Sequence, residues 1–203
     1  MTVCRPGPNP GRDRAVGHHA SLQLADRVLQ RWRIAAAAAW IPAASRILDV
    51  GCGDGMLFRV LADRHRGGVG IDPTLTAETD SGSVRLIRGS FPDAVPHGTF
   101  DVVTMLAVIE HLPVEVLAIT GPTTAQALRP GGRAILTVPA PTVDRIVDLL
   151  VRLRLAEGMT LHEHHGFDPA GVPSLFVPHG FRLLHHRRFE LGLNHLYVFE
   201  RSL

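Results

Sequence analysis

Lysine is absent from the 203-residue sequence, and all 21 of its Lys/Arg positions are arginines. A lysine nucleophile or a Schiff base on lysine is therefore excluded. The arginines are scattered and the formal net charge is only +2, which gives weak support for nucleic acid as a partner. Aromatic residues make up only 5% of the chain, which limits stacking platforms for unpaired bases.

Cysteine is also scarce. Cys4 lies in a segment rich in proline and glycine, and Cys52 lies inside a glycine turn, so the two are poorly placed to pair. This suits a reducing compartment. No apolar run approaches the roughly 18 residues of a membrane span, and the polar start lacks the apolar core of a signal peptide. We therefore expect a cytoplasmic protein with no membrane span.

The chain has the length of one domain. Composition predicts a flexible N-terminal segment over residues 1–17 and a single domain over residues 18–203. Within this domain we expect an N-terminal helix over 21–40, a cofactor-binding core over 46–138, and an acceptor-side loop with terminal strands over 139–203.

Strand-like and helix-like segments alternate through the core, which favours parallel strands with crossover helices. The fold class that follows is α/β, a doubly wound Rossmann-like sheet of seven strands, mostly parallel, with an antiparallel C-terminal strand pair. The predicted strands are 46–50, 68–72, 84–88, 100–105, 132–138, 181–189 and 195–200. The predicted crossover helices are 55–64, 113–128 and 142–155.

The most informative segment is the glycine turn Gly51-Cys-Gly53-Asp-Gly55 after the first predicted strand. A dinucleotide fingerprint requires its third glycine one residue later, where this chain has Met56. Asp49 and Asp54 flank the turn, and two carboxylates would repel a pyrophosphate while suiting a cationic amino group. The second strand ends in Asp72, where a carboxylate can accept hydrogen bonds from ribose hydroxyls.

Four segments in this order resemble class I S-adenosylmethionine-dependent methyltransferases, and more narrowly their small-molecule, ubiquinone-biosynthesis-like branch. They are Leu48–Gly55, Gly70–Asp72, Phe100–Leu112 and Leu128–Gly132. The resemblance implies S-adenosylmethionine as cofactor. It puts Asp49, Gly51 and Gly53 around the methionine moiety and Asp72 on the ribose, while Ser90 and Phe91 would lie against adenine. Cys52 and Leu106 complete the expected cofactor-binding set.

One position departs from the family pattern. Many relatives have an acid where Ser90 stands, and a hydroxyl is a weaker acceptor for the adenine amino group. Adenine recognition would then depend on the Phe91 backbone and on apolar stacking. Phe91 can equally be a core residue, and Asp72 a turn residue before Pro73.

Histidines are the candidates for a catalytic base, which transfer to a hydroxyl would require. His111 follows the fourth predicted strand, while His164 and His165 lie in a loop before the terminal strands. Alternation along a strand would send His185 and His186 to opposite faces, so these two are interpreted as structural. The spacing of the loop histidines and carboxylates gives weak support for a metal, and we expect none.

The resulting hypothesis is transfer of a methyl group from S-adenosylmethionine to oxygen or nitrogen of a small-molecule acceptor, such as a sugar, a glycolipid precursor or a natural-product scaffold. Nucleic acid is not expected as a partner, because the aromatic clamp of base methyltransferases is missing after the fourth strand. Two alternatives stay open: a non-catalytic binder of S-adenosylmethionine or S-adenosylhomocysteine, and an NAD-dependent oxidoreductase. The sequence does not indicate the acceptor or the oligomeric state.

Overall fold

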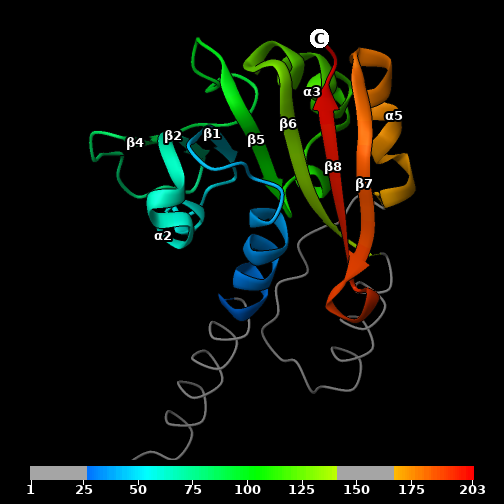
Figure 1. The fold of residues 1–203 in the computed structure, drawn as a ribbon, viewed down its shortest axis with the longest axis horizontal. Coiled ribbons are helices and arrows are strands. Elements are labelled where there is room, and N and C mark those ends of the chain that lie inside the picture. The colour runs from blue at the N-terminus through cyan, green and yellow to red at the C-terminus, as the bar shows by residue number, and fades with distance from the viewer. Residues whose placement is uncertain (1–26, 141–166) are drawn as a thin grey trace, which may run out of the picture.

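A computed structural model describes residues 27–140 and 167–203 of the chain. The described residues form one eight-stranded sheet with helices on both faces, and the strand order is β3-β4-β2-β1-β5-β6-β8-β7. Figure 1 shows β4 near one end of this arrangement and β7 near the other. The strands are β1 Ser45–Val50, β2 His65–Asp72, β3 Thr79–Asp80, β4 Val84–Arg88, β5 Phe100–Leu106, β6 Leu128–Pro139, β7 Phe181–Phe189 and β8 Asn194–Arg201.

The strand pairs confirm the predicted doubly wound fold. The pairs β4–β2, β2–β1, β1–β5 and β5–β6 are parallel, and β8 joins β6 and β7 in antiparallel pairs. The count of seven strands was wrong by one. The extra strand, β3, is only two residues long and pairs antiparallel with the edge strand β4, so its sequence is too short to give an alternating pattern.

Helices cover the two faces of the sheet. Residues 27–38 form the described part of the N-terminal helix, followed along the chain by α2 Met56–Leu61, α3 Val114–Ala127 and α5 Val172–Phe176. One core cluster contains Leu136 and Tyr197 and lies under α3 and α5. The other contains Ile135 and Val198 and lies under the N-terminal helix and α2. Residues one apart on a strand thus enter different cores, because side chains alternate between faces.

The predicted helices over 55–64 and 113–128 are confirmed as α2, with a short 3-10 turn after it, and α3. The predicted helix over 142–155 and the predicted N-terminal segment over 1–17 lie outside the described residues. Within the described part of the chain, no helix is long and apolar enough to cross a membrane.

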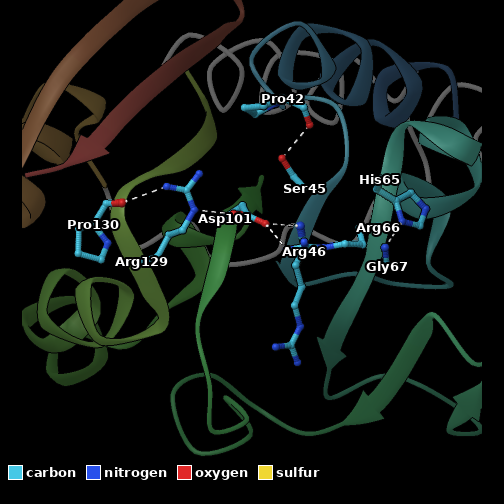
Figure 2. A network of polar contacts seen from close by, with 9 residues as sticks. All are labelled: Pro42, Ser45, Arg46, His65, Arg66, Gly67, Asp101, Arg129 and Pro130. Carbon is cyan, nitrogen blue, oxygen red and sulfur yellow. Dashed lines mark hydrogen bonds and ion pairs between the residues drawn. The ribbon is translucent and has the colours of Figure 1, made fainter. Parts of the chain in front are cut away.

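At the amino-terminal edge of the parallel strands, Asp101 of β5 joins three neighbouring segments (Figure 2). Its carboxylate accepts hydrogen bonds from the backbone N–H of Arg46 at 2.7 Å and from the Nε of Arg129 at 2.5 Å. Arg66 approaches the same carboxylate at 3.4 Å. These contacts connect the starts of β1, β2, β5 and β6, so Asp101 fixes the edge of the sheet that faces away from the glycine turn.

Candidate cofactor and methyl-transfer site

The glycine turn connects β1 to α2 at the carboxyl edge of the parallel strands. Gly51, Gly53 and Gly55 have φ angles of 71°, 52° and 77°, which glycine adopts far more readily than other residues. A Cβ atom on Gly51 would lie 2.3 Å from Cγ2 of Val108, a residue that follows β5. The turn and the segment after β5 therefore approach so closely that only a residue without a side chain fits at position 51.

Asp49 lies buried on β1, two residues before the turn. The Oγ1 of Thr104 on the neighbouring strand β5 donates a hydrogen bond of 2.6 Å to its carboxylate. Burial raises the pKa of Asp49 to about 7; the hydrogen bond from Thr104 lowers it and the nearby charge of Asp72 raises it further. Such a carboxylate loses its charge easily unless a cation comes close. The site is therefore suited to an ammonium group.

A small cavity of about 30 Å³ opens beside Asp49. Gln30 and Arg33 from the N-terminal helix line it together with Asp49, Gly51, Cys52 and Leu106. The Nε of Arg33 is buried and has no hydrogen-bond partner among the described residues. The cavity thus presents a carboxylate and a guanidinium at the same glycine turn, a combination that matches the ammonium and carboxylate of a free amino acid.

Cys52 belongs to this cavity but is not a nucleophile. Its Sγ lies 2.7 Å from the position that a Cβ on Gly70 would occupy, so the thiol packs against the bare backbone of β2. Burial raises the pKa of Cys52 to about 12, and the charges of Asp49 and Asp72 add to this effect. The thiol therefore stays protonated at neutral pH.

Asp72 supports the glycine turn from the end of β2. One carboxylate oxygen accepts the backbone N–H of Gly53 at 2.8 Å, and the other accepts the backbone N–H and the hydroxyl of Thr74 at 2.8 and 2.6 Å. Asp72 therefore makes the turn contacts that the sequence left open as an alternative. The expected hydrogen bond from a ribose hydroxyl to Asp72 stays a prediction. A ribose would bind to a carboxylate that already accepts the backbone N–H of Gly53.

A second, larger cavity of about 420 Å³ lies on the other side of Gly51. It is mostly apolar and includes the predicted residues Ser90, Phe91 and His111. The rest of its lining comprises Val50, Gly51, Ile71, Pro73, Gly89, Pro92, Asp93, Val108, Leu112, Pro113 and Val116. Gly51 lines both cavities, so the amino-acid end and the apolar end of one elongated ligand could be held on either side of the turn.

Of the predicted catalytic histidines, only His111 falls within the described residues. Its Nε2 lies 3.9 Å from the Oε1 of Glu110, which is buried, while the His111 side chain is 41% exposed at the larger cavity. His164 and His165 lie outside the described residues. Within residues 27–140 and 167–203, no three His, Cys, Asp or Glu side chains are grouped so that they could hold a metal ion.

Two features of the site differ from the sequence analysis. Asp54, which was counted beside Asp49 as an acid suited to an amino group, is exposed and forms an ion pair of 2.7 Å with Arg59. Gln30 and Arg33 were not predicted as site residues. Their spacing of three residues puts them on one face of the N-terminal helix, and that signal was present in the sequence.

Comparison with known proteins identifies the family. Residues 17–191 match a family model described as a methyltransferase domain. The chain belongs to this family. The prediction that the chain belongs to the class I S-adenosylmethionine-dependent methyltransferases, a family of enzymes, is confirmed.

The names of individual relatives of this chain indicate different acceptors. It is 31% identical over 137 residues to the ribosomal protein L11 methyltransferase of Thermus thermophilus, covering 63% of this chain and 48% of the relative. It is 28% identical over 157 residues to the ubiquinone biosynthesis O-methyltransferase of Psychrobacter arcticus, covering 68% of this chain and 60% of the relative. The chain thus spans about half the length of the curated relatives it matches.

Among solved structures, a 1,6-didemethyltoxoflavin-N1-methyltransferase from Burkholderia thailandensis superimposes with a TM-score of 0.64 at 17% identity. The match covers 99% of this chain and 94% of that one. The likeness confirms the fold. The structure was solved with 1,6-didemethyltoxoflavin and S-adenosylhomocysteine bound.

Proposed function

We propose that this methyltransferase moves a methyl group from S-adenosylmethionine to an oxygen or nitrogen of a small-molecule acceptor. The observation that carries the proposal is that two groups line the same small cavity at the glycine turn: the buried carboxylate of Asp49 and the buried Nε of Arg33, which has no hydrogen-bond partner among the described residues. Asp49 would bind the ammonium of the methionine moiety and Arg33 its carboxylate. The larger cavity would take the adenosine, with Ser90 and Phe91 beside adenine.

The contribution of the chain to catalysis is alignment and exclusion of water. S-adenosylmethionine, when bound, supplies a methyl group on a positively charged sulfur. Val108 packs closely against the glycine turn, and His111 is among the residues that line the larger cavity. Transfer by in-line displacement gains most of its acceleration from such positioning. His111 lines the larger cavity and would contact an acceptor bound there.

The similarity to a ubiquinone biosynthesis O-methyltransferase supports a small-molecule acceptor. The composition supports it as well, because scattered arginines and few aromatic residues give little support for nucleic acid as the acceptor. The ribosomal-protein relative makes a protein acceptor the competing class. A non-catalytic binder is the second competitor, and an NAD-dependent oxidoreductase is disfavoured by the glycine spacing and by the two buried acids at the turn. One set of binding and transfer measurements separates these possibilities.

Calorimetric titration with S-adenosylmethionine, S-adenosylhomocysteine and NAD tests the cofactor. Gly51→Ala should abolish binding of the first two, because the new Cβ would overlap Val108 and the φ angle of 71° adds about 1 kcal/mol of strain. Gly82→Ala is the matched control, since Gly82 has a φ of 82° but nothing lies within 4 Å of the added Cβ. Equal binding by both variants would contradict the site assignment.

Transfer of labelled methyl groups tests the reaction. We expect incorporation into members of a panel of hydroxylated aromatic acids, sugars and amines, and none into ribosomal protein L11. Tight binding of S-adenosylmethionine without transfer to any acceptor would favour the non-catalytic binder. Transfer to L11 alone would identify a protein methyltransferase.

A further inference from the structure

The face of the sheet under α5 carries a column of parallel aromatic rings. His195, Tyr197 and Phe199 alternate along β8 and therefore lie on one face. The ring of His186 on β7 stacks on Tyr197 with a centroid distance of 4.3 Å, and its plane is within 10° of that of His195. Phe199 continues the column into the core, whereas His186 is exposed. His186 thus forms the solvent end of the stack, while His195 beside it is buried.

A β-bulge puts His186 on this face. The pairing of β7 with β8 shifts between Leu183 and His185, after which His185 lies opposite Val198 and His186 opposite Tyr197. His185 consequently points to the other face, where it stacks on Trp40 at 4.5 Å. The prediction that these neighbouring histidines face opposite ways is confirmed. Bulges re-aim side chains and are common beside active sites.

The two histidine rings share a hydrogen bond. Nε2 of His186 lies 2.9 Å from Nδ1 of His195, so one ring must donate a hydrogen and the other must offer a lone pair. Both rings cannot be doubly protonated while the bond lasts. The pair therefore has room for one additional proton, which sits on either ring and is stabilised by the other.

The surroundings keep this pair neutral at physiological pH. Burial lowers the pKa of His186, and the charges of Arg188 and His185 lower it further. Burial also lowers the pKa of His195, with His186 and Arg188 acting in the same direction and Asp168 in the opposite one. A neutral imidazole has a free lone pair and can accept a proton.

The position of the pair is at the acceptor edge of the sheet. His195 pairs with Val138 near the carboxyl end of β6, and Leu106 at the end of β5 pairs with Thr137 on the same strand. Residues at or after the ends of β1 and β5 line the two cavities at this same edge: Gly51 lines both, Val108 the larger and Leu106 the smaller. The hydroxyl of Tyr197 donates to the carbonyl of Pro169 at 2.8 Å, which fixes the stack against the segment before α5.

We propose that His186 and His195 act as one proton-accepting unit for an acceptor hydroxyl, which makes this enzyme an O-methyltransferase. The inference rests on the proposed function. As the acceptor O–H bond breaks, its proton goes to an imidazole nitrogen of the pair and its electrons form the new O–CH₃ bond. The S–CH₃ bond breaks at the same time, and its electrons remain on sulfur, which becomes neutral.

The test compares His186→Gln and His195→Gln with His185→Gln, a matched control whose ring lies on the opposite face. Labelled methyl transfer is measured on a series of phenols of graded acidity and on aliphatic alcohols. Loss of the pair should reduce transfer to weakly acidic hydroxyls about 100-fold or more, the usual effect of losing a general base. Phenols already ionised at the assay pH should react as before, and His185→Gln should change neither group.

Three results would overturn the inference. If the histidine variants lose transfer equally to ionised and un-ionised acceptors, the pair has a structural role. If their transfer is unchanged, the pair has no role in the reaction. If the wild type transfers methyl groups only to amines, the acceptor is not a hydroxyl. Imidazole NMR titration gives a readout that needs no acceptor: the pair should take up one proton below the ordinary imidazole pKa, and two independent titrations would contradict the shared bond. If the wild-type protein does not bind S-adenosylmethionine, the proposed function is wrong. The NMR titration of the histidine pair would still be valid in that case.

Discussion

Asp49 and Asp101 lie on neighbouring parallel strands, β1 and β5, but at opposite edges of the sheet. Asp101 has an arginine backbone N–H and two arginine side chains around it. Among the described groups, Asp49 has the hydroxyl of Thr104 as its hydrogen-bond partner and a second carboxylate, Asp72, nearby. Asp101 is thus bonded to cationic side chains of the protein, whereas no cationic side chain of the described residues is bonded to Asp49, which fits its proposed role as the partner of an ammonium group.

The pKa values follow this difference. Burial raises the pKa of both groups. At Asp101 the hydrogen bonds from Arg46 and Arg129, together with the charges of Arg129 and Arg66, outweigh burial and lower the pKa below its ordinary value. At Asp49 burial dominates and the pKa rises to about 7. The paired carboxylate at the amino edge therefore stabilises the fold. The buried carboxylate at the carboxyl edge costs stability, as is common at functional sites.

Asp49→Asn should give the largest effect on binding. Removing the partner of a desolvated ammonium costs about 2 kcal/mol or more, so affinity for S-adenosylmethionine should fall about 30-fold or more. Asp54→Asn in the same loop is the control, because Asp54 is exposed and paired with Arg59. Calorimetry measures both. Equal affinity of the two variants for S-adenosylmethionine would contradict the proposed role of Asp49 in binding.

Asp101→Asn should reduce stability rather than binding. The amide cannot replace a charged acceptor of three donors, and the expected cost is about 1–3 kcal/mol in the free energy of unfolding. Asp49→Asn should cost little or even stabilise the unliganded protein above pH 7, where it removes a buried charge. Chemical denaturation of both variants tests this contrast, which a larger loss for Asp49→Asn would refute.

The two aspartates should give opposite pH dependences of stability. The raised pKa of Asp49 means that its contribution is present below pH 4 and is lost as the pH rises through about 7. The lowered pKa of Asp101 means that its contribution is present above the ordinary carboxyl pKa and is lost as the pH falls. Denaturation between pH 4 and 8 should show the first slope in the wild type but not in Asp49→Asn. An unchanged slope would contradict the assignment.

Arg66→Gln should give the smallest effect. Its contact with Asp101 is 3.4 Å long and its side chain is 68% exposed, so the change in unfolding free energy should stay below about 1 kcal/mol. The comparison variant is Arg129→Gln, which loses a 2.5 Å bond to the same carboxylate. If Arg66→Gln destabilises the chain more than Arg129→Gln, the ranking of contacts at the amino edge is wrong.

The sequence predicted the parts of this protein that depend on local pattern. Apolar runs located β1, β2 and β5, and the glycines at 51, 53 and 55 located the turn, because only that residue adopts those φ angles without strain. The resemblance added the expected order of site residues. These features can be predicted without knowing which residues lie on the neighbouring strands.

Contacts between distant segments were not predictable in the same way. Nothing local indicates that Val108 closes over Gly51, that Thr104 donates to Asp49, or that a bulge at Leu184 turns His186 toward His195. Each depends on the register between strands. For Asp54, local sequence was misleading. Its position beside the turn predicted contact with the ligand's amino group, but its carboxylate is paired with Arg59.

A crystal structure of the chain with S-adenosylhomocysteine tests the central claim most directly. We expect the ligand's ammonium within hydrogen-bond distance of Asp49, its carboxylate at Arg33, and its adenine in the larger cavity beside Ser90 and Phe91. A ligand bound elsewhere, or one whose amino-acid end points away from Asp49, would contradict it.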